Sequence, residues 1–243
     1  MRFLKANHLF IKFMTSSLLI SLRKIWRATK LKKLFAYSRG YEDRFSRNLF
    51  DLIKVSDTVW DVGANHGLFA IQFSNLVGNS GKIICFEPDE QSFSNLVLNT
   101  STFAQIQCNQ IALGSQSETR KFMFGTDILR AESKILAKDS KTYDSMVSIR
   151  SGDELVASGQ VPAPNVIKID VEGFELEVVK GLRHLLVSHE LRLIGMEIHF
   201  GQLAKQNSPS APREILDILL ASGFAIKFFD PSHVIAKKND QIY

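Results

Sequence analysis

The stretch Val59-Trp60-Asp61-Val62-Gly63-Ala64-Asn65-His66-Gly67 decides the fold of this 243-residue chain. Its first four residues form a short apolar run, which is typical of a buried strand, and the glycine-containing segment after them is typical of a tight turn. From residue 68 to residue 77, apolar residues recur at helical spacing. The stretch therefore predicts one strand-loop-helix unit.

The same alternation continues on the C-terminal side of this unit. Further strands are predicted at residues 82–86, 105–113, 166–170 and 193–198, and helices after the first and third of these and at 212–221. Repeated alternation of strand and helix predicts a mostly parallel sheet that is covered on both faces. Residues 114–161 show no such unit, and we expect an insertion of short strands or loops there.

The C-terminus departs from this alternation. Two apolar runs, 224–229 and 234–236, are separated by only four residues, so they must pair as an antiparallel hairpin. A mostly parallel sheet that ends in such a hairpin is the seven-stranded arrangement of class I methyltransferases. The sequence therefore predicts an α/β, Rossmann-like class I methyltransferase fold.

The loop after the first strand indicates which cofactor binds. A dinucleotide site needs Gly-x-Gly-x-x-Gly, which lets bare backbone meet a pyrophosphate at a helix N-terminus. Here the spacing is Asp61-x-Gly63-x-Asn65-x-Gly67. S-adenosylmethionine has no phosphate but carries an ammonium and a sulfonium, which suit an acid at the strand end. We therefore expect these four residues to bind S-adenosylmethionine.

Two neighbouring strand ends extend the expected cofactor site. Glu87 ends the second strand 20 residues after Gly67, where an acid can accept hydrogen bonds from both hydroxyls of a ribose. Asn109 and Gln110 lie at the end of the third predicted strand, and their amides can donate to and accept from the edge of an adenine. Ordinary turn residues are an equally good interpretation of this Asn-Gln pair.

The fourth strand carries a second group of acids. Ligands of open α/β sheets bind at the carboxyl ends of the strands, and Asp170 and Glu172 lie there. Lys168 shares a face with Asp170, so the two side chains can pair. Glu175 enters the first turn of the next helix, where an acid favourably opposes the helix dipole, so we assign it no catalytic role. Because no third ligand is apparent at useful spacing, no metal site is predicted.

Taken together, the motifs resemble the FkbM family of S-adenosylmethionine-dependent methyltransferases. The resemblance spans about residues 41–238, and its most specific element is the segment Lys168-Ile-Asp170-Val-Glu172-Gly173. Its other elements are Tyr41-Glu42, the loop from Asp61 to Gly67, Phe86-Glu87-Pro88, Ala112-Leu113-Gly114 and Met196-Glu197-Ile-His199.

The resemblance implies a particular reaction. Members of the family are mainly O-methyltransferases that act on hydroxyls of sugars or polyketides, and many are found among enzymes of glycan biosynthesis. It implies direct displacement of the sulfonium-bound methyl group by an acceptor oxygen, with Asp170 near that methyl group. The candidate catalytic residues are Asp170, His199 and Glu172, and of the two candidate bases we favour Asp170 over His199 because a lone histidine beside an apolar run is more often structural.

The basic charge is concentrated in an N-terminal arm, residues 1–40, which precedes the catalytic domain predicted at 41–243. The arm contains ten of the lysines and arginines, whereas all 25 acidic residues follow it. Its apolar stretch, residues 9–22, is shorter than the roughly 20 residues that span a bilayer. A helix lying on anionic lipid, an organelle-targeting peptide and a helix packed on the domain all fit this pattern.

Two other classes of function fit the sequence less well. One is a non-catalytic cofactor-binding scaffold that the arm recruits, and the other is an RNA methyltransferase, although the acidic domain offers no continuous basic surface for nucleic acid. Two cysteines, Cys85 and Cys108, do not make a disulfide scaffold and are expected in buried strands. We therefore expect a cytoplasmic enzyme with a small-molecule or glycan acceptor, peripheral at the membrane if the arm binds lipid.

Overall fold

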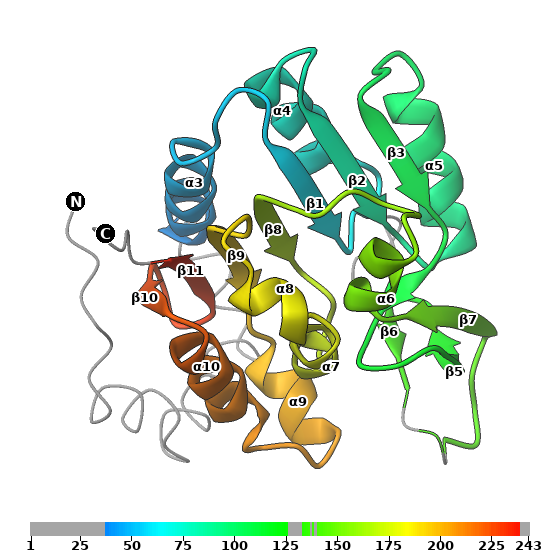
Figure 1. Cartoon of the computed structure of the whole chain (residues 1–243). Coiled ribbons are helices and arrows are strands. Elements are labelled where there is room, and N and C mark those ends of the chain that lie inside the picture. Colours follow the sequence, from blue (N-terminus) through cyan, green and yellow to red (C-terminus); the bar gives the residue numbers. More distant parts are fainter. Residues whose placement is uncertain (1–36, 126–132, 137, 139, 239–243) are drawn as a thin grey trace.

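A seven-stranded sheet forms the centre of the computed structural model, which describes residues 37–125, 133–136, 138 and 140–238 (Figure 1). Its order is β10-β11-β9-β8-β1-β2-β3, and all neighbours are parallel except the pairs β10–β11 and β11–β9. The strands are β1 (Thr58–Val62), β2 (Lys82–Phe86), β3 (Ile106–Asn109), β8 (Val166–Ile169), β9 (Leu193–Glu197), β10 (Phe224–Phe228) and β11 (His233–Lys238). The predicted fold class, including the antiparallel hairpin, is confirmed.

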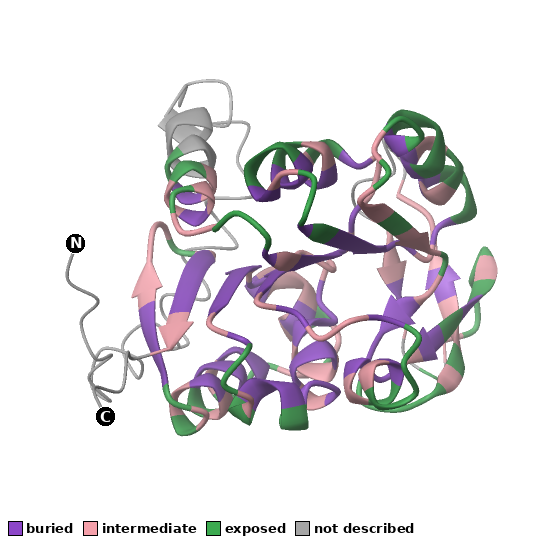
Figure 2. Ribbon diagram, turned by 45° about the horizontal axis from the view of Figure 1, so that its top comes forward, coloured by how far each residue is buried: buried purple, intermediate pink, exposed green. Residues whose placement is uncertain are grey.

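Helices cover both faces of this sheet, because successive strand residues point to opposite sides. Val59 and Ile83 pack with α3 (Tyr37–Phe50), α4 (Leu68–Val77) and α5 (Glu90–Thr100). Trp60 and Ile84 pack on the other side with α7 (Glu175–Lys180), α8 (Arg183–Val187) and α10 (Ala211–Ala221). Figure 2 shows buried residues along the central strands and exposed residues on the outer sides of the helices.

A second, four-stranded sheet occupies much of the predicted insertion. It has the order β4-β7-β5-β6, and its strands are β4 (Ala112–Leu113), β5 (Glu118–Met123), β6 (Lys134–Ile135) and β7 (Ser145–Arg150). The prediction of one strand over 105–113 is wrong in one respect, because the chain leaves the first sheet after Asn109 and enters the second at Ala112. A short helix that the sequence did not indicate, α6 (Gly152–Ala157), follows β7.

The helix predicted after the fourth strand is divided into α7 and α8. The break lies at Gly181, where a Cβ would stand 1.9 Å from the carbonyl oxygen of Gly114, so the chain approaches the second sheet too closely for any other residue. A further helix, α9 (Phe200–Lys205), follows β9. Within the described ranges, no helix is both long enough and apolar enough to cross a bilayer. The interpretations of the N-terminal arm concern mostly residues 1–36, which lie outside the described residues.

Candidate active site

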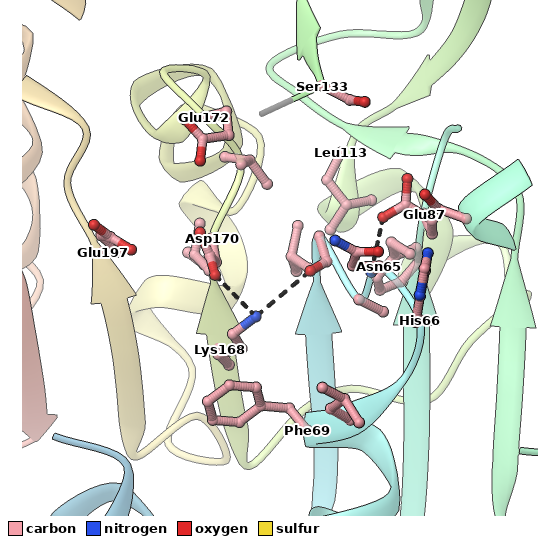
Figure 3. A pocket seen from close by; sticks show the side chains of 18 of the residues that line it. Asn65, His66, Phe69, Glu87, Leu113, Ser133, Lys168, Asp170, Glu172 and Glu197 are labelled. Carbon is pink, nitrogen blue, oxygen red and sulfur yellow. Dashed lines mark hydrogen bonds and ion pairs between the residues drawn. The ribbon is translucent and has the colours of Figure 1, made fainter. Parts of the chain in front are cut away.

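A cavity of about 920 Å³ lies at the carboxyl ends of β1, β2, β8 and β9. Its walls include five of the predicted site residues, Gly63, Asn65, Glu87, Asp170 and Glu172. Figure 3 shows Asn65, His66 and Glu87 on one side of the cavity and Asp170, Glu172 and Glu197 on the other. The two groups of motifs found in the sequence therefore line one cavity.

The loop after β1 is fixed by contacts with both neighbouring strands. The backbone N–H groups of Gly63 and Ala64 donate to the carbonyl oxygen of Phe86, at 3.0 and 3.2 Å. Gly63 has a φ of +79°, and a Cβ there would lie 1.9 Å from the carbonyl oxygen of Asp170. Only glycine fits this position, because any side chain would separate the loops that follow β1 and β8.

Glu87 and Asn65 form the polar part of one cavity wall. Glu87 Oε2 accepts from the backbone N–H of Asn65 at 2.9 Å, and its Oε1 accepts from the N–H of Asp89 at 2.9 Å. Burial raises the pKa of Glu87 to about 7, although these two N–H groups oppose the shift. Asn65 Oδ1 is buried and makes no hydrogen bond. Both side chains thus have acceptor capacity left for the hydroxyl and ammonium groups of S-adenosylmethionine.

The other predicted cofactor residues do not line the cavity. Gly67 precedes α4 with a φ of +84° and packs beside Leu96. Asn109 uses its side-chain N–H to bind the carbonyl oxygen of Cys85 at 3.1 Å, and Gln110 is exposed. Apolar Leu113, from the second sheet, supplies cavity wall beyond the end of β3. Leu113 belongs to the motif Ala112-Leu113-Gly114, so this motif could have indicated it as a site residue.

Asp61 does not line the cavity, but it pairs with Lys168, which does. Lys168 Nζ is 3.3 Å from Asp61 Oδ1. The same nitrogen is 3.4 Å from Asp170 Oδ2 and 4.7 Å from the ring centre of Phe69 (Figure 3). Burial alone would lower the pKa of Lys168, but the two carboxylates raise it, so the lysine stays charged. Burial raises the pKa of Asp61, against the opposing effect of Lys168. The predicted pairing of Lys168 with Asp170 is confirmed.

His199 lies beneath the acidic side of the cavity, 3% exposed, at the start of α9. Its Nδ1 is 2.6 Å from Oε1 of Glu175, a carboxylate that is fully buried. Its Nε2 is 3.2 Å from Glu172 Oε1 and 3.8 Å from Asp170 Oδ1. Burial lowers the pKa of His199, but the bonds to Glu172 and Glu175 raise it well above its ordinary value. The carboxylates around His199 therefore favour its charged form, and Asp170 remains the preferred candidate base.

Glu175 has a different role from the one expected. The sequence indicates an acid that opposes the helix dipole, but Oε1 of this carboxylate accepts from the backbone N–H groups of Gly173 and His199, at 3.0 and 3.3 Å. Sequence reasoning also missed Glu197 and His233, which line the cavity and lie 3.5 Å apart. His233 pairs with Asp230 at 2.7 Å as well.

The fold is similar to that of solved methyltransferase structures. A solved structure described as a putative rRNA methylase, from Clostridium thermocellum, superimposes with a TM-score of 0.50 at 10% identity, covering 82% of this chain and 96% of that one. This likeness shows the fold, which is that of a class I methyltransferase. The model of the methyltransferase FkbM domain matches residues 61–226. The chain belongs to this FkbM family, whose cofactor is S-adenosylmethionine.

Two characterised relatives match most of the domain. The hexuronic acid methyltransferase AglP of Haloferax volcanii is 34% identical over 183 residues, which cover 74% of this chain and 69% of that protein. Methyltransferase 1 of Beauveria bassiana is 26% identical over 179 residues, covering 64% and 69%.

Proposed function

We propose that this methyltransferase transfers a methyl group to a hydroxyl of a sugar or glycan precursor, with hexuronic acids as the first substrates to test. The similarity to a hexuronic acid methyltransferase supports a sugar acceptor. The observation that carries the proposal is the position of Asp170, whose carboxylate lies in the same cavity as Glu87 and Asn65 and is 37% exposed. A sugar hydroxyl is weakly acidic, so its methylation requires such a group to orient it and accept its proton.

The cofactor is assigned to the side of the cavity that contains Glu87 and Asn65. The Glu87 carboxylate would accept hydrogen bonds from the ribose hydroxyls, and Asn65 Oδ1 from the ammonium group. Gly63 lets the backbone approach the ligand. When bound, S-adenosylmethionine supplies a methyl group on a positively charged sulfur.

The acceptor is assigned to the acidic side. There the Asp170 carboxylate accepts the hydroxyl proton, while Lys168 Nζ holds its Oδ2 in place at 3.4 Å. His199 lies behind these acids, with Nε2 3.2 Å from Glu172 Oε1 and 3.8 Å from Asp170 Oδ1, and serves as a positioning residue for them. The buried apolar wall around Leu113 and Phe174 excludes water from the cofactor.

The substitution Asp170→Asn tests this assignment. It preserves the shape of the side chain but removes its charge, so we expect kcat to fall by about 10²–10⁴-fold with little change in cofactor affinity. A labelled-methyl assay over hexuronic acids and neutral sugars gives the rate, and calorimetric titration gives the cofactor affinity. Glu177→Gln, on the exposed side of α7, is the matched control. An Asp170→Asn enzyme with full activity would exclude the assigned role.

The N-terminal arm adds a proposal about location. Its ten basic residues, with no acid among residues 1–40, favour contact with an anionic membrane surface. Removing residues 1–36 should abolish salt-sensitive binding to anionic vesicles and leave cofactor affinity intact. A truncated protein that still binds vesicles would refute this location.

A further inference from the structure

We propose that Asp170, Glu172 and His199 bind one divalent metal cation at the acceptor side of the cavity. The three residues come from the loops after β8 and β9, which the sheet places next to each other. One ligand atom from each lies within 4.8 Å of the other two. Sequence reasoning found the two acids but no third ligand, because His199 is 27 residues beyond Glu172 and joins the acids only through the pairing of β8 with β9.

A carboxylate bonded to Nδ1 orients His199, as is usual for metal-binding histidines. Its Nδ1 is bonded to Glu175 Oε1 at 2.6 Å, and the backbone N–H groups of Gly173 and His199 fix that same oxygen. This arrangement makes Nδ1 the N–H donor and directs Nε2 toward the acids. A carboxylate behind the imidazole sets the tautomer and raises the basicity of the ligating nitrogen.

Three carboxylates converge on that one nitrogen. Oxygens of Glu172, Glu197 and Asp170 lie 3.2, 3.7 and 3.8 Å from Nε2. A nitrogen carries at most one proton, so His199 donates one hydrogen bond at Nε2, while Lys168 also pairs with Asp170 and His233 with Glu197. A divalent cation bonds several ligands at once. Ligands bonded at about 2.1 Å and at right angles lie about 3.0 Å apart, so small movements of the side chains would suffice.

The surrounding charge also favours a cation. Six carboxylates belong to the connected cluster, those of Asp61, Asp170, Glu172, Glu175, Glu197 and Asp230, and the cations Lys168, His199 and His233 face them. The cluster is negative even with His199 protonated, and a cation that binds Nε2 would displace the proton of that nitrogen to solvent. The burial of His199 and Glu175 strengthens the attraction for a further cation. One imidazole with carboxylate oxygens suits Mn²⁺ and related divalent metals.

The cation would bind the acceptor's hydroxyl oxygen and hold it beside Asp170. This part of the inference rests on the proposed function, whereas the metal site itself does not. With a cation bound, the metal would help to orient the hydroxyl, and Asp170 would still accept its proton.

Calorimetric titration of Mn²⁺ into the chelator-treated full-length protein tests the site directly. We expect one binding site, weakened at least 10-fold by Glu172→Gln and about 10- to 100-fold by Glu175→Gln, which holds the histidine without being a proposed ligand itself. Glu177→Gln, two residues from Glu175, should bind Mn²⁺ like the wild type. Titration with S-adenosylmethionine confirms that each variant is folded. If Glu175→Gln does not fold, the result for Glu172→Gln, at the cavity surface, decides the test.

The outcomes separate the metal site from the proposed reaction. A protein that binds S-adenosylmethionine but not Mn²⁺ overturns the inference, and so does Mn²⁺ binding that Glu172→Gln leaves unchanged. Chelator-resistant sugar methylation in such a protein would leave the proposed function intact. Specific Mn²⁺ binding without methylation of any sugar would instead retain the site and reject the acceptor.

Discussion

Replacing Lys168 with methionine would leave the carboxylate of Asp61 buried without its cation. The lysine side chain is 6% exposed and Asp61 is fully buried, with 3.3 Å between Nζ and Oδ1. Removing one partner of such a pair typically costs about 3–5 kcal/mol, because the remaining charge is uncompensated. Asp170, the other partner, is 37% exposed, so water screens its charge and it adds little to this cost. We therefore expect the free energy of unfolding at pH 7 to fall by about 3–5 kcal/mol.

Urea denaturation followed by circular dichroism measures this change. Lys168→Met combined with Asp61→Asn should recover much of the loss, because no charge then remains buried. Burial already raises the pKa of Asp61, so this carboxyl should be protonated in mild acid in the single variant, and the penalty should shrink as the pH falls.

The surface pair of Lys180 and Glu214 provides the control. Its atoms are 2.9 Å apart, but the side chains are 25% and 46% exposed, so Lys180→Met should cost no more than about 1 kcal/mol. If Lys168→Met costs as little as this control, or if the double variant is no more stable than the single one, the reasoning about the buried pair is refuted.

Three further outcomes follow from the charged groups of the site. Glu87→Gln should weaken binding of S-adenosylmethionine, measured by calorimetry, by about 1.5–3 kcal/mol. The affinity of the wild type should rise from about pH 6 to about pH 8, because the pKa of Glu87 is about 7 and only the ionised carboxylate accepts from both hydroxyls. Burial lowers the pKa of His233, but Asp230 and Glu197 raise it from 6.5 to about 10, so its contribution to stability is complete below pH 6.5 and is lost as the pH approaches 10. In urea titrations across this range His233→Gln should show a smaller decline than the wild type, and an equal decline would exclude His233 as the cause. Glu175→Gln should destabilise the protein by about 1–3 kcal/mol, whereas a merely dipolar role predicts at most about 1 kcal/mol in the same titration.

The fold could be predicted from the sequence because its signals are local. The strand β1 with its glycine loop, and the short hairpin connection between β10 and β11, each occupy fewer than about 15 consecutive residues. Glu87 could be placed as well, because the end of a strand adjacent to β1 must lie beside the loop that follows β1.

The parts of the site that the sequence does not reveal depend on contacts between distant segments. Asn109 and Gln110 are predicted to bind the adenine because they lie at the end of the third strand, which is expected within residues 105–113. The chain instead passes from the first sheet to the second within these residues, so Leu113 faces the cavity from a different sheet. The sequence does not show how the two sheets pack, and a cavity wall built by the second sheet cannot be assigned without that packing.

The contact between Glu175 and His199 could have been anticipated from the local sequence, as a comparison of Glu175 with Glu177 shows. Both acids lie in the first turn of α7, and the dipole argument treats them alike. The helical period distinguishes them, because Glu175 shares a face with Val178, Val179 and Leu182, all fully buried, whereas Glu177 does not. An acid on the apolar face of a helix must find a hydrogen-bonding or cationic partner, since an unpaired buried charge is very costly. The helical phase alone therefore predicts that Glu175 has a buried hydrogen-bonding or cationic partner, and in the folded chain His199 is that partner.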